Sequence, residues 1–206
     1  IASCLVGSEM CIRDRYTEQM NAQIGAIIDK EVTATVIPGF INWETYRAFK
    51  RAMYSVKSSE YNSEQKDDFI VQSYSLMNLF MTAVFSIGLL EELIEYGIVD
   101  SVEKPDQRLH RIEETAKGFP DFLKESATSV VSILEDAYLE LHDSTYKETA
   151  FLKAIETHQG KIAVIVPKAY FGIVINKLLS LHNLDSRANI CLSLIHISEP
   201  TRQEAI

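Results

Sequence analysis

The chain has 206 residues, with 20 Lys and Arg against 29 Asp and Glu, and its formal net charge is −9. This acidic balance argues against a general nucleic-acid-binding module, whose phosphate contacts need clustered Lys and Arg, although it leaves room for a local basic groove. The length suits one domain, or one domain with part of another.

The two ends are expected not to encode native protein. Residues 192–202 (LSLIHISEPTR) resemble the translation of a transposase-type library adapter, and residues 5–15 resemble the same adapter translated from the other strand. Residues 203–206 can be back-translated so that the reverse complement, shifted by one base, encodes residues 1–4. One DNA segment on opposite strands therefore accounts for both ends.

We therefore expect residues 1–15 and 191–206 to be adapter-derived, and residues 16–190 to be an internal piece of a longer protein. Met20 lies inside a helical pattern, so it is not expected to be a native start. All three cysteines lie in the two ends: Cys4, Cys11 and Cys191. Disulfides and thiolate metal sites are therefore excluded from residues 16–190.

The first predicted elements are a helix and a short strand. Apolar residues recur at helical spacing over residues 16–31, which predicts a helix. Residues 32–37 are β-branched and apolar and stop at Pro38, which predicts a strand followed by a turn.

A second helix is predicted from Asn42, as its N-cap, to about Ser58. Its expected apolar face consists of Trp43, Tyr46, Phe49, Met53 and Val56. Its opposite face is basic and consists of Arg47, Lys50, Arg51 and Lys57. This basic face is the candidate contact for phosphate or for an acidic partner, with an ordinary solvated surface as the alternative. No aromatic residue is expected between the four cations to stack on bases.

A polar loop is predicted over residues 58–68, followed by one buried central helix over residues 69–96 that Gly97 ends. A membrane span is the alternative for this apolar segment. Its uninterrupted apolar stretch is shorter than the roughly 18–20 residues that a span needs, and acidic residues flank it. The pattern therefore favours a buried helix, no membrane contact and a cytoplasmic protein.

Two more helices complete the predicted bundle. Pro105 suits the first position of a helix over residues 105–117. Residues 120–141 carry the clearest apolar pattern at spacings of three and four, which predicts a helix packed against the central one.

The pattern changes after residue 143. Ser144 is the predicted N-cap of a helix through His158. Residues 161–166 form a continuous apolar run, which is typical of a strand buried on both faces in a parallel sheet. A helix is predicted over residues 168–181. The fold class is therefore mainly α: a helical bundle over residues 16–143, followed over residues 144–190 by the beginning of an α/β lobe that is expected to be incomplete.

No motif marks a catalytic, cofactor-binding or metal site. Gly160 and Lys161 precede a strand, whereas a phosphate loop follows one. The remaining candidates are best explained as solvated groups: the general acids Glu91, Glu92 and Glu95, the ligands His142, Asp143 and His158, and the helical pair His110 and Glu114.

Residues 146–167 (YKETAFLKAIETHQGKIAVIVP) resemble the beginning of the second RecA-like lobe of superfamily 2 helicases, in which a lysine-bearing helix leads through a glycine into a buried strand. The resemblance implies backbone and hydroxyl contacts with a nucleic-acid strand. Pro167 and Lys168 replace the usual polar residue after the strand. The ATP-binding and arginine-finger motifs would lie outside this chain, so ATP and Mg²⁺ belong to the parent protein.

Two functions are therefore expected as alternatives. In the first, the chain is part of a helicase-like, nucleic-acid-dependent ATPase, such as those of anti-phage defence systems. It then supplies a helical accessory region and part of the second lobe, and its partner is the rest of the same polypeptide. In the second, it is a helical interaction or regulatory domain without ATPase activity.

Overall fold

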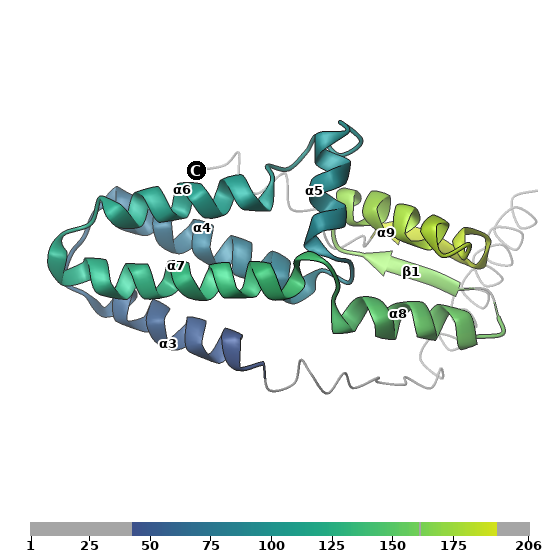
Figure 1. Ribbon diagram of the computed structural model, residues 1–206, viewed down its shortest axis with the longest axis horizontal. Helices are drawn as coiled ribbons and strands as arrows, with labels where there is room; N and C mark the ends of the chain where they lie inside the picture. The colour runs from purple at the N-terminus through teal and green to yellow at the C-terminus, as the bar shows by residue number, and fades with distance from the viewer. Residues whose placement is uncertain (1–42, 161, 193–206) are drawn as a thin grey trace, which may run out of the picture. The chain divides into compact units, whose positions relative to one another are not determined.

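The computed structural model describes residues 43–160 and 162–192 (Figure 1). The helices are α3 (Glu44–Ser58), α4 (Glu64–Thr82), α5 (Ile87–Glu95), α6 (Pro105–Lys117), α7 (Asp121–His142), α8 (Tyr146–Thr157), α9 (Ala169–Leu181) and the 3-10 turn η1 (Asp185–Arg187); the strands are β1 (Ile162–Val166) and β2 (Ala188–Leu192). The described part is mainly α, as the sequence predicts. The helix predicted over residues 16–31 and the strand predicted over residues 32–37 lie outside the described residues.

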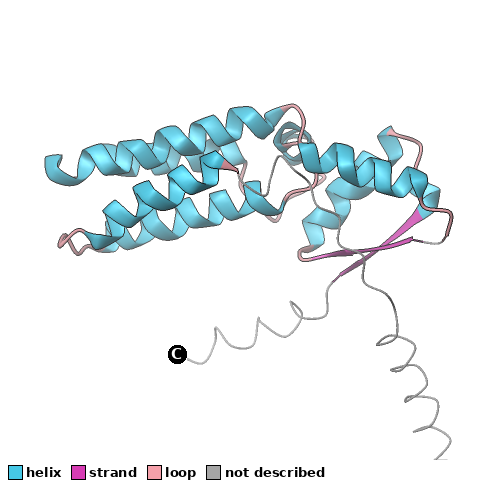
Figure 2. Ribbon diagram, turned by 90° about the horizontal axis from the view of Figure 1, so that it is seen from below, coloured by secondary structure: helices cyan, strands magenta, loops and turns pink. Residues whose placement is uncertain are grey.

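Helices α3, α4 and α6 pack around α7, and the four run side by side in both ribbon views (Figures 1 and 2). The apolar stripe of α7 faces this core, where Val130, Leu134 and Ala137 have no exposed surface. Phe49 of α3 is equally buried. Burial of apolar side chains stabilises this region by about 25 cal/mol per Å² removed from water.

The prediction of one helix over residues 69–96 is wrong, because the segment forms α4 and α5, which are bent by 110° at the break between them. Ala83 and Phe85, within the break, are buried and hold it in the core. No single helix of the described residues is long and apolar enough to cross a membrane, and α4 and α5 pass that test only as a bent pair.

The two ends of this break are capped from α8. The Lys147 ammonium donates to the Met81 carbonyl at the end of α4, and the Glu148 carboxylate accepts from the Ser86 N–H before α5 at 2.7 Å. These groups satisfy backbone atoms that a helix end leaves without an intrahelical partner. They come from a part of the sequence more than 60 residues away.

The other helix boundaries differ from the predictions by a few residues. The N-cap of α3 is Trp43, not Asn42, and that of α8 is Thr145, not Ser144, because the Thr145 hydroxyl accepts from the Glu148 N–H at 2.9 Å. The loop predicted over residues 58–68 is shorter, since Ser63 caps α4 through the Lys66 N–H.

Strands β1 and β2 form a parallel two-stranded sheet in which Ile162 pairs with Ala188 and Val166 with Leu192. Helix α9 connects them and covers one face, and Val166 and Ala188 are buried there. A Cβ on Gly172 of α9 would lie 3.2 Å from the Ile190 side chain, so this glycine permits a close approach to the sheet.

The expectation that β1 is buried on both faces is wrong. Ala163 is exposed and Ile165 is 71% exposed, both on the face away from α9. Among the described residues, the helices lie on one side of the two strands (Figure 2). Successive strand residues point to opposite faces, so a single helical layer buries only every second residue of β1.

The α/β region also contacts the bundle through α5. The Phe85 and Phe171 rings lie edge to face with centroids 5.1 Å apart, and α5 packs against α9. The described residues belong to one compact unit.

Candidate functional site

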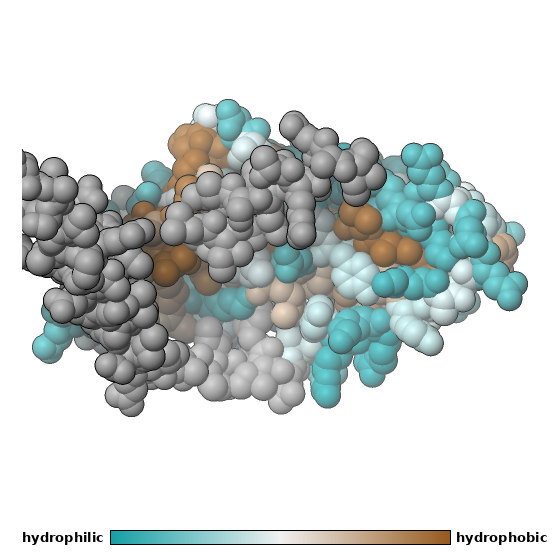
Figure 3. Space-filling model, turned by 180° about the vertical axis from the view of Figure 1, so that it is seen from behind, coloured by the Kyte–Doolittle hydropathy of each residue, from teal (hydrophilic) through white to brown (hydrophobic). Residues whose placement is uncertain are grey.

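The basic face predicted from the sequence lies along α3. Phe49, Met53 and Val56 face the core, so the residues at the complementary helical positions point outward. All four predicted contact residues are exposed: Arg47, Lys50, Arg51 and Lys57. Hydrophilic side chains project along the edge of the molecule where α3 lies, at the lower right of Figure 3. A phosphate or acidic-partner contact remains a prediction for this face.

The four cations have few anionic neighbours. Arg47 pairs with Glu44 at 2.7 Å, where both side chains are more than half exposed. Lys50 and Lys57 lie over the rings of Tyr46 and Tyr74, at 5.8 and 5.5 Å from the ring centroids. An exposed ion pair contributes little, about 0–1 kcal/mol, so the positive charge of this face stays available.

An aromatic residue lies between these cations, contrary to our expectation. Tyr54 is 72% exposed and lies three residues after Arg51 and three before Lys57. Its spacing of seven from Arg47 could have revealed it, since residues i and i+7 share a helix face. The sequence analysis placed Tyr54 on neither face of this helix.

The structure brings a second set of predicted groups together, in an acidic cavity of about 690 Å³. The Glu91 carboxylate and the His142 ring nitrogen Nε2 lie 3.8 Å apart in this cavity. The other ring nitrogen of His142, Nδ1, lies 2.6 Å from the Asp143 carboxylate. Glu92, Glu95 and Asp106 also line the cavity. His158 is not among its lining residues, so the ligand set of His142, Asp143 and His158 is not assembled.

Glu91 is held by hydrogen bonds from two other helices. The Tyr138 hydroxyl donates to one of its oxygens at 2.9 Å, and the Asp106 N–H donates to the other at 2.9 Å. Burial, and then the contact with Glu91, raise the pKa of Tyr138 above its ordinary value. These bonds fix the start of α6 and the end of α7 against α5, so they account for Glu91 structurally.

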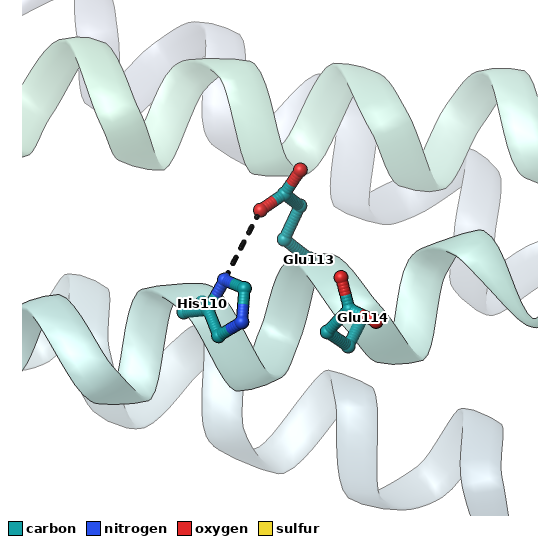
Figure 4. Close-up of side chains that lie close together, drawn as sticks. All are labelled: His110, Glu113 and Glu114. Atoms are coloured by element: carbon teal, nitrogen blue, oxygen red, sulfur yellow. Dashed lines mark ion pairs between the residues drawn. The ribbon is translucent and has the colours of Figure 1, made fainter.

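His110, Glu113 and Glu114 of α6 also approach one another (Figure 4). The His110 ring and the Glu113 carboxylate are 3.5 Å apart, and the dashed line in the figure marks this ion pair. Lys117 contacts both carboxylates at 2.8 Å. Hydrogen bonds from Lys117 lower the pKa of Glu113. Both carboxylates of this group are therefore already paired with an ammonium.

Lys147 is the one described lysine whose pKa is clearly lowered. Burial lowers it to about 8, and its ammonium caps α4 as described above. Burial likewise raises the pKa of its neighbour Glu148. Both groups are engaged in capping, and neither faces the acidic cavity or the basic face.

Comparison with protein-family models, curated proteins and solved structures finds no match for this chain.

Proposed function

We propose that residues 43–190 supply a helical accessory region and part of an α/β lobe to a larger, helicase-like, nucleic-acid-dependent ATPase. The observation that carries this proposal is the parallel pairing of β1 with β2 across α9. Within residues 43–190 we assign no catalytic group. ATP and Mg²⁺ would be bound by other parts of the parent protein, and we place that protein in the cytoplasm.

Parallel pairing is informative because it needs a crossover connection. Two adjacent parallel strands cannot be joined by a tight turn, and the usual connection is a helix packed on the sheet. Helix α9 meets this requirement, and RecA-like lobes are built from such units. The helix α8, Gly160, β1 and α9 follow one another in the order that the resemblance to superfamily 2 helicases implies.

The exposed face of β1 sets a condition on this proposal. All-parallel sheets occur almost only with both faces covered, yet Ile165 is 71% exposed. In a complete lobe, further strands and helices would have to cover the Ile165 face. The last two residues of β2, Cys191 and Leu192, fall in the segment that we attribute to adapter, so the pairing that supports the lobe is that of residues 162–164 with residues 188–190.

The same exposed face favours the second candidate, a helical interaction or regulatory domain without ATPase activity. The bundle of α3, α4, α6 and α7 buries its own core, so it has the means to fold without a complete lobe. In that case the two-stranded sheet is a small appendage of the bundle.

Assembly of the source DNA beyond residues 16 and 190 separates the two candidates. The extended native protein would be purified and its ATP hydrolysis measured with and without single-stranded nucleic acid. The proposal expects hydrolysis that nucleic acid stimulates, and loss of it when the lysine of an upstream phosphate loop is changed to alanine. A reading frame that stops soon after residue 190, or an extended protein without ATPase activity, would leave the second candidate.

A further inference from the structure

The exposed face of α3 has a consequence for partner binding. We propose that it binds single-stranded nucleic acid, with Tyr54 as a platform on which a base stacks and with four flanking cations on the phosphates: Arg47, Lys50, Arg51 and Lys57. This inference rests on the proposed function, because it names the surface through which such a protein would contact its nucleic acid.

The geometry of the helix places these groups in one row. Residues three, four and seven apart share a helix face, and Tyr54 stands at such spacings from Arg47, Lys50, Arg51 and Lys57. The row from Arg47 to Lys57 spans about 15 Å at the helical rise of 1.5 Å per residue. The proposal assigns one phosphate of the bound strand to each of the four cations.

The charge of this face differs from that of the chain as a whole. The chain carries a net charge of −9, whereas Glu44 is the one acidic residue within α3. In the part of the chain that the structure describes, Arg51 has no ion pair, and Lys50 and Lys57 lie over tyrosine rings. Polyanions are therefore attracted to this face and repelled by most of the remaining surface.

Tyr54 is the residue that favours single-stranded nucleic acid over a duplex or an acidic peptide as the polyanion bound. Its ring is 72% exposed and makes no ring contact with another described residue, so packing does not account for an aromatic side chain there. Base stacking on an exposed aromatic ring stabilises single-stranded complexes by about 1–3 kcal/mol per base. Paired bases in a duplex keep their faces covered, and an acidic peptide would use the cations without the ring.

The test measures fluorescence anisotropy of a labelled 15-nucleotide oligo(dT) with the full chain at several NaCl concentrations. The logarithm of the association constant should fall with that of salt with a slope of about −2.8, from four phosphate contacts at about 0.7 each. Tyr54→Ala should weaken binding at least about fivefold, the lower limit of one stacking contact, and Tyr54→Phe should restore it.

Matched controls separate the surface from general charge. Tyr96 is 71% exposed and lines the acidic cavity, so Tyr96→Ala should leave binding unchanged. The double variant Lys50→Glu with Arg51→Glu should abolish binding. The variant Lys153→Glu with Lys177→Glu has the same net charge, alters exposed lysines of α8 and α9, and should bind within twofold of the unchanged chain. Circular dichroism confirms that each variant is folded.

Three outcomes would overturn the inference: no binding by the unchanged chain, equal binding by the Tyr54→Ala variant, or stronger binding of a labelled oligo-glutamate peptide than of oligo(dT). The third would identify an acidic protein as the partner. None of them bears on the α/β-lobe proposal, which depends on the ATPase activity of the extended protein.

Discussion

The helical region, residues 43–143, and the α/β region, residues 144–192, solve the problem of burying apolar surface differently. In the helical region each helix buries one apolar stripe in the core, and α3, α4 and α6 pack against α7. In the α/β region α9 buries one face of the sheet, while Ile165 on the other face stays 71% exposed. A helix needs cover along one stripe, whereas a strand with a continuous apolar run needs it on two faces.

This difference shows which region buries its apolar surface without further elements. A closed core loses stability wherever a large side chain is removed, but an open sheet face contributes almost nothing until something covers it. The junction between the regions combines an apolar contact of Phe85 with Phe171 and polar caps, since Lys147 and Glu148 of α8 bind the two ends of the α4–α5 break. Each region, and the junction, can be tested by a different kind of substitution.

The largest effect is expected in the helical core. Phe49 of α3 has no exposed surface, and its ring meets that of Tyr74 edge to face at 5.3 Å. Phe49→Ala should lower the free energy of unfolding by about 3–5 kcal/mol, from lost apolar burial and a residual cavity. Urea unfolding followed by circular dichroism measures this, with Tyr54→Ala on the exposed face of the same helix as the control. A loss below about 1 kcal/mol would show that α3 is not held by the core as described.

A smaller effect is expected at Gly88, where α5 meets the end of α7. A Cβ at this position would lie 2.9 Å from the His142 carbonyl oxygen and 3.1 Å from its ring. Gly88→Ala should therefore cost about 1–3 kcal/mol of unfolding free energy, although alanine is the better helix former. Gly118→Ala is the matched control, because its Cβ would come no closer than 3.4 Å to a neighbour. Equal thermal midpoints of the two variants would contradict this close approach.

The helices were the most predictable part of the fold. Pro105 begins α6 and Gly97, with a φ of 67°, follows α5, as their local chemistry predicts. The break between α4 and α5 could not be predicted from residues 69–96, because apolar residues lie on almost every side of that segment and the groups that cap the break lie in α8. Local patterns do not contain such long-range contacts.

The candidate site, like the helices, was predictable where it depends on local spacing and not where it depends on long-range contacts. Helical spacing placed Arg47, Lys50, Arg51 and Lys57 on one face, and they are exposed there. Tyr54 was missed because the sequence analysis assigned it to neither face, although its spacing from Arg47 and Arg51 places it with the cations. The meeting of Glu91 with Tyr138 and His142 joins residues about 50 positions apart, so no local pattern could indicate it.

The junction should respond to pH through Lys147. Burial lowers its pKa to about 8 from an ordinary value of 10.5, so between these values the unfolded chain binds more protons than the folded one. Stability should therefore rise as the pH increases from 8 to 9.5, with a slope below about 1.4 kcal/mol per pH unit because the group is partly exposed.

Lys147→Met removes this titration, and its urea midpoint should change less over the same pH range than that of the unchanged chain. Measurements stop at pH 9.5, because tyrosines with raised pKa values, Tyr138 and Tyr170, oppose the effect at higher pH. Parallel pH profiles of the two proteins would show that Lys147 is not desolvated at the end of α4.

The smallest effect is expected on the open face of the sheet. Ile165→Asp should change the unfolding free energy of this chain by no more than about 0.5 kcal/mol, because its side chain is already in water. Val166→Asp, one residue later on the covered face, should cost more than about 2 kcal/mol, since Val166 is 2% exposed and a buried carboxylate has no partner there. In the extended native protein the α/β-lobe proposal predicts that Ile165→Asp becomes destabilising too, because neighbouring elements then cover it. If the substitution is harmless in both proteins, β1 is an edge with a solvated face, and the helical interaction domain is the better explanation.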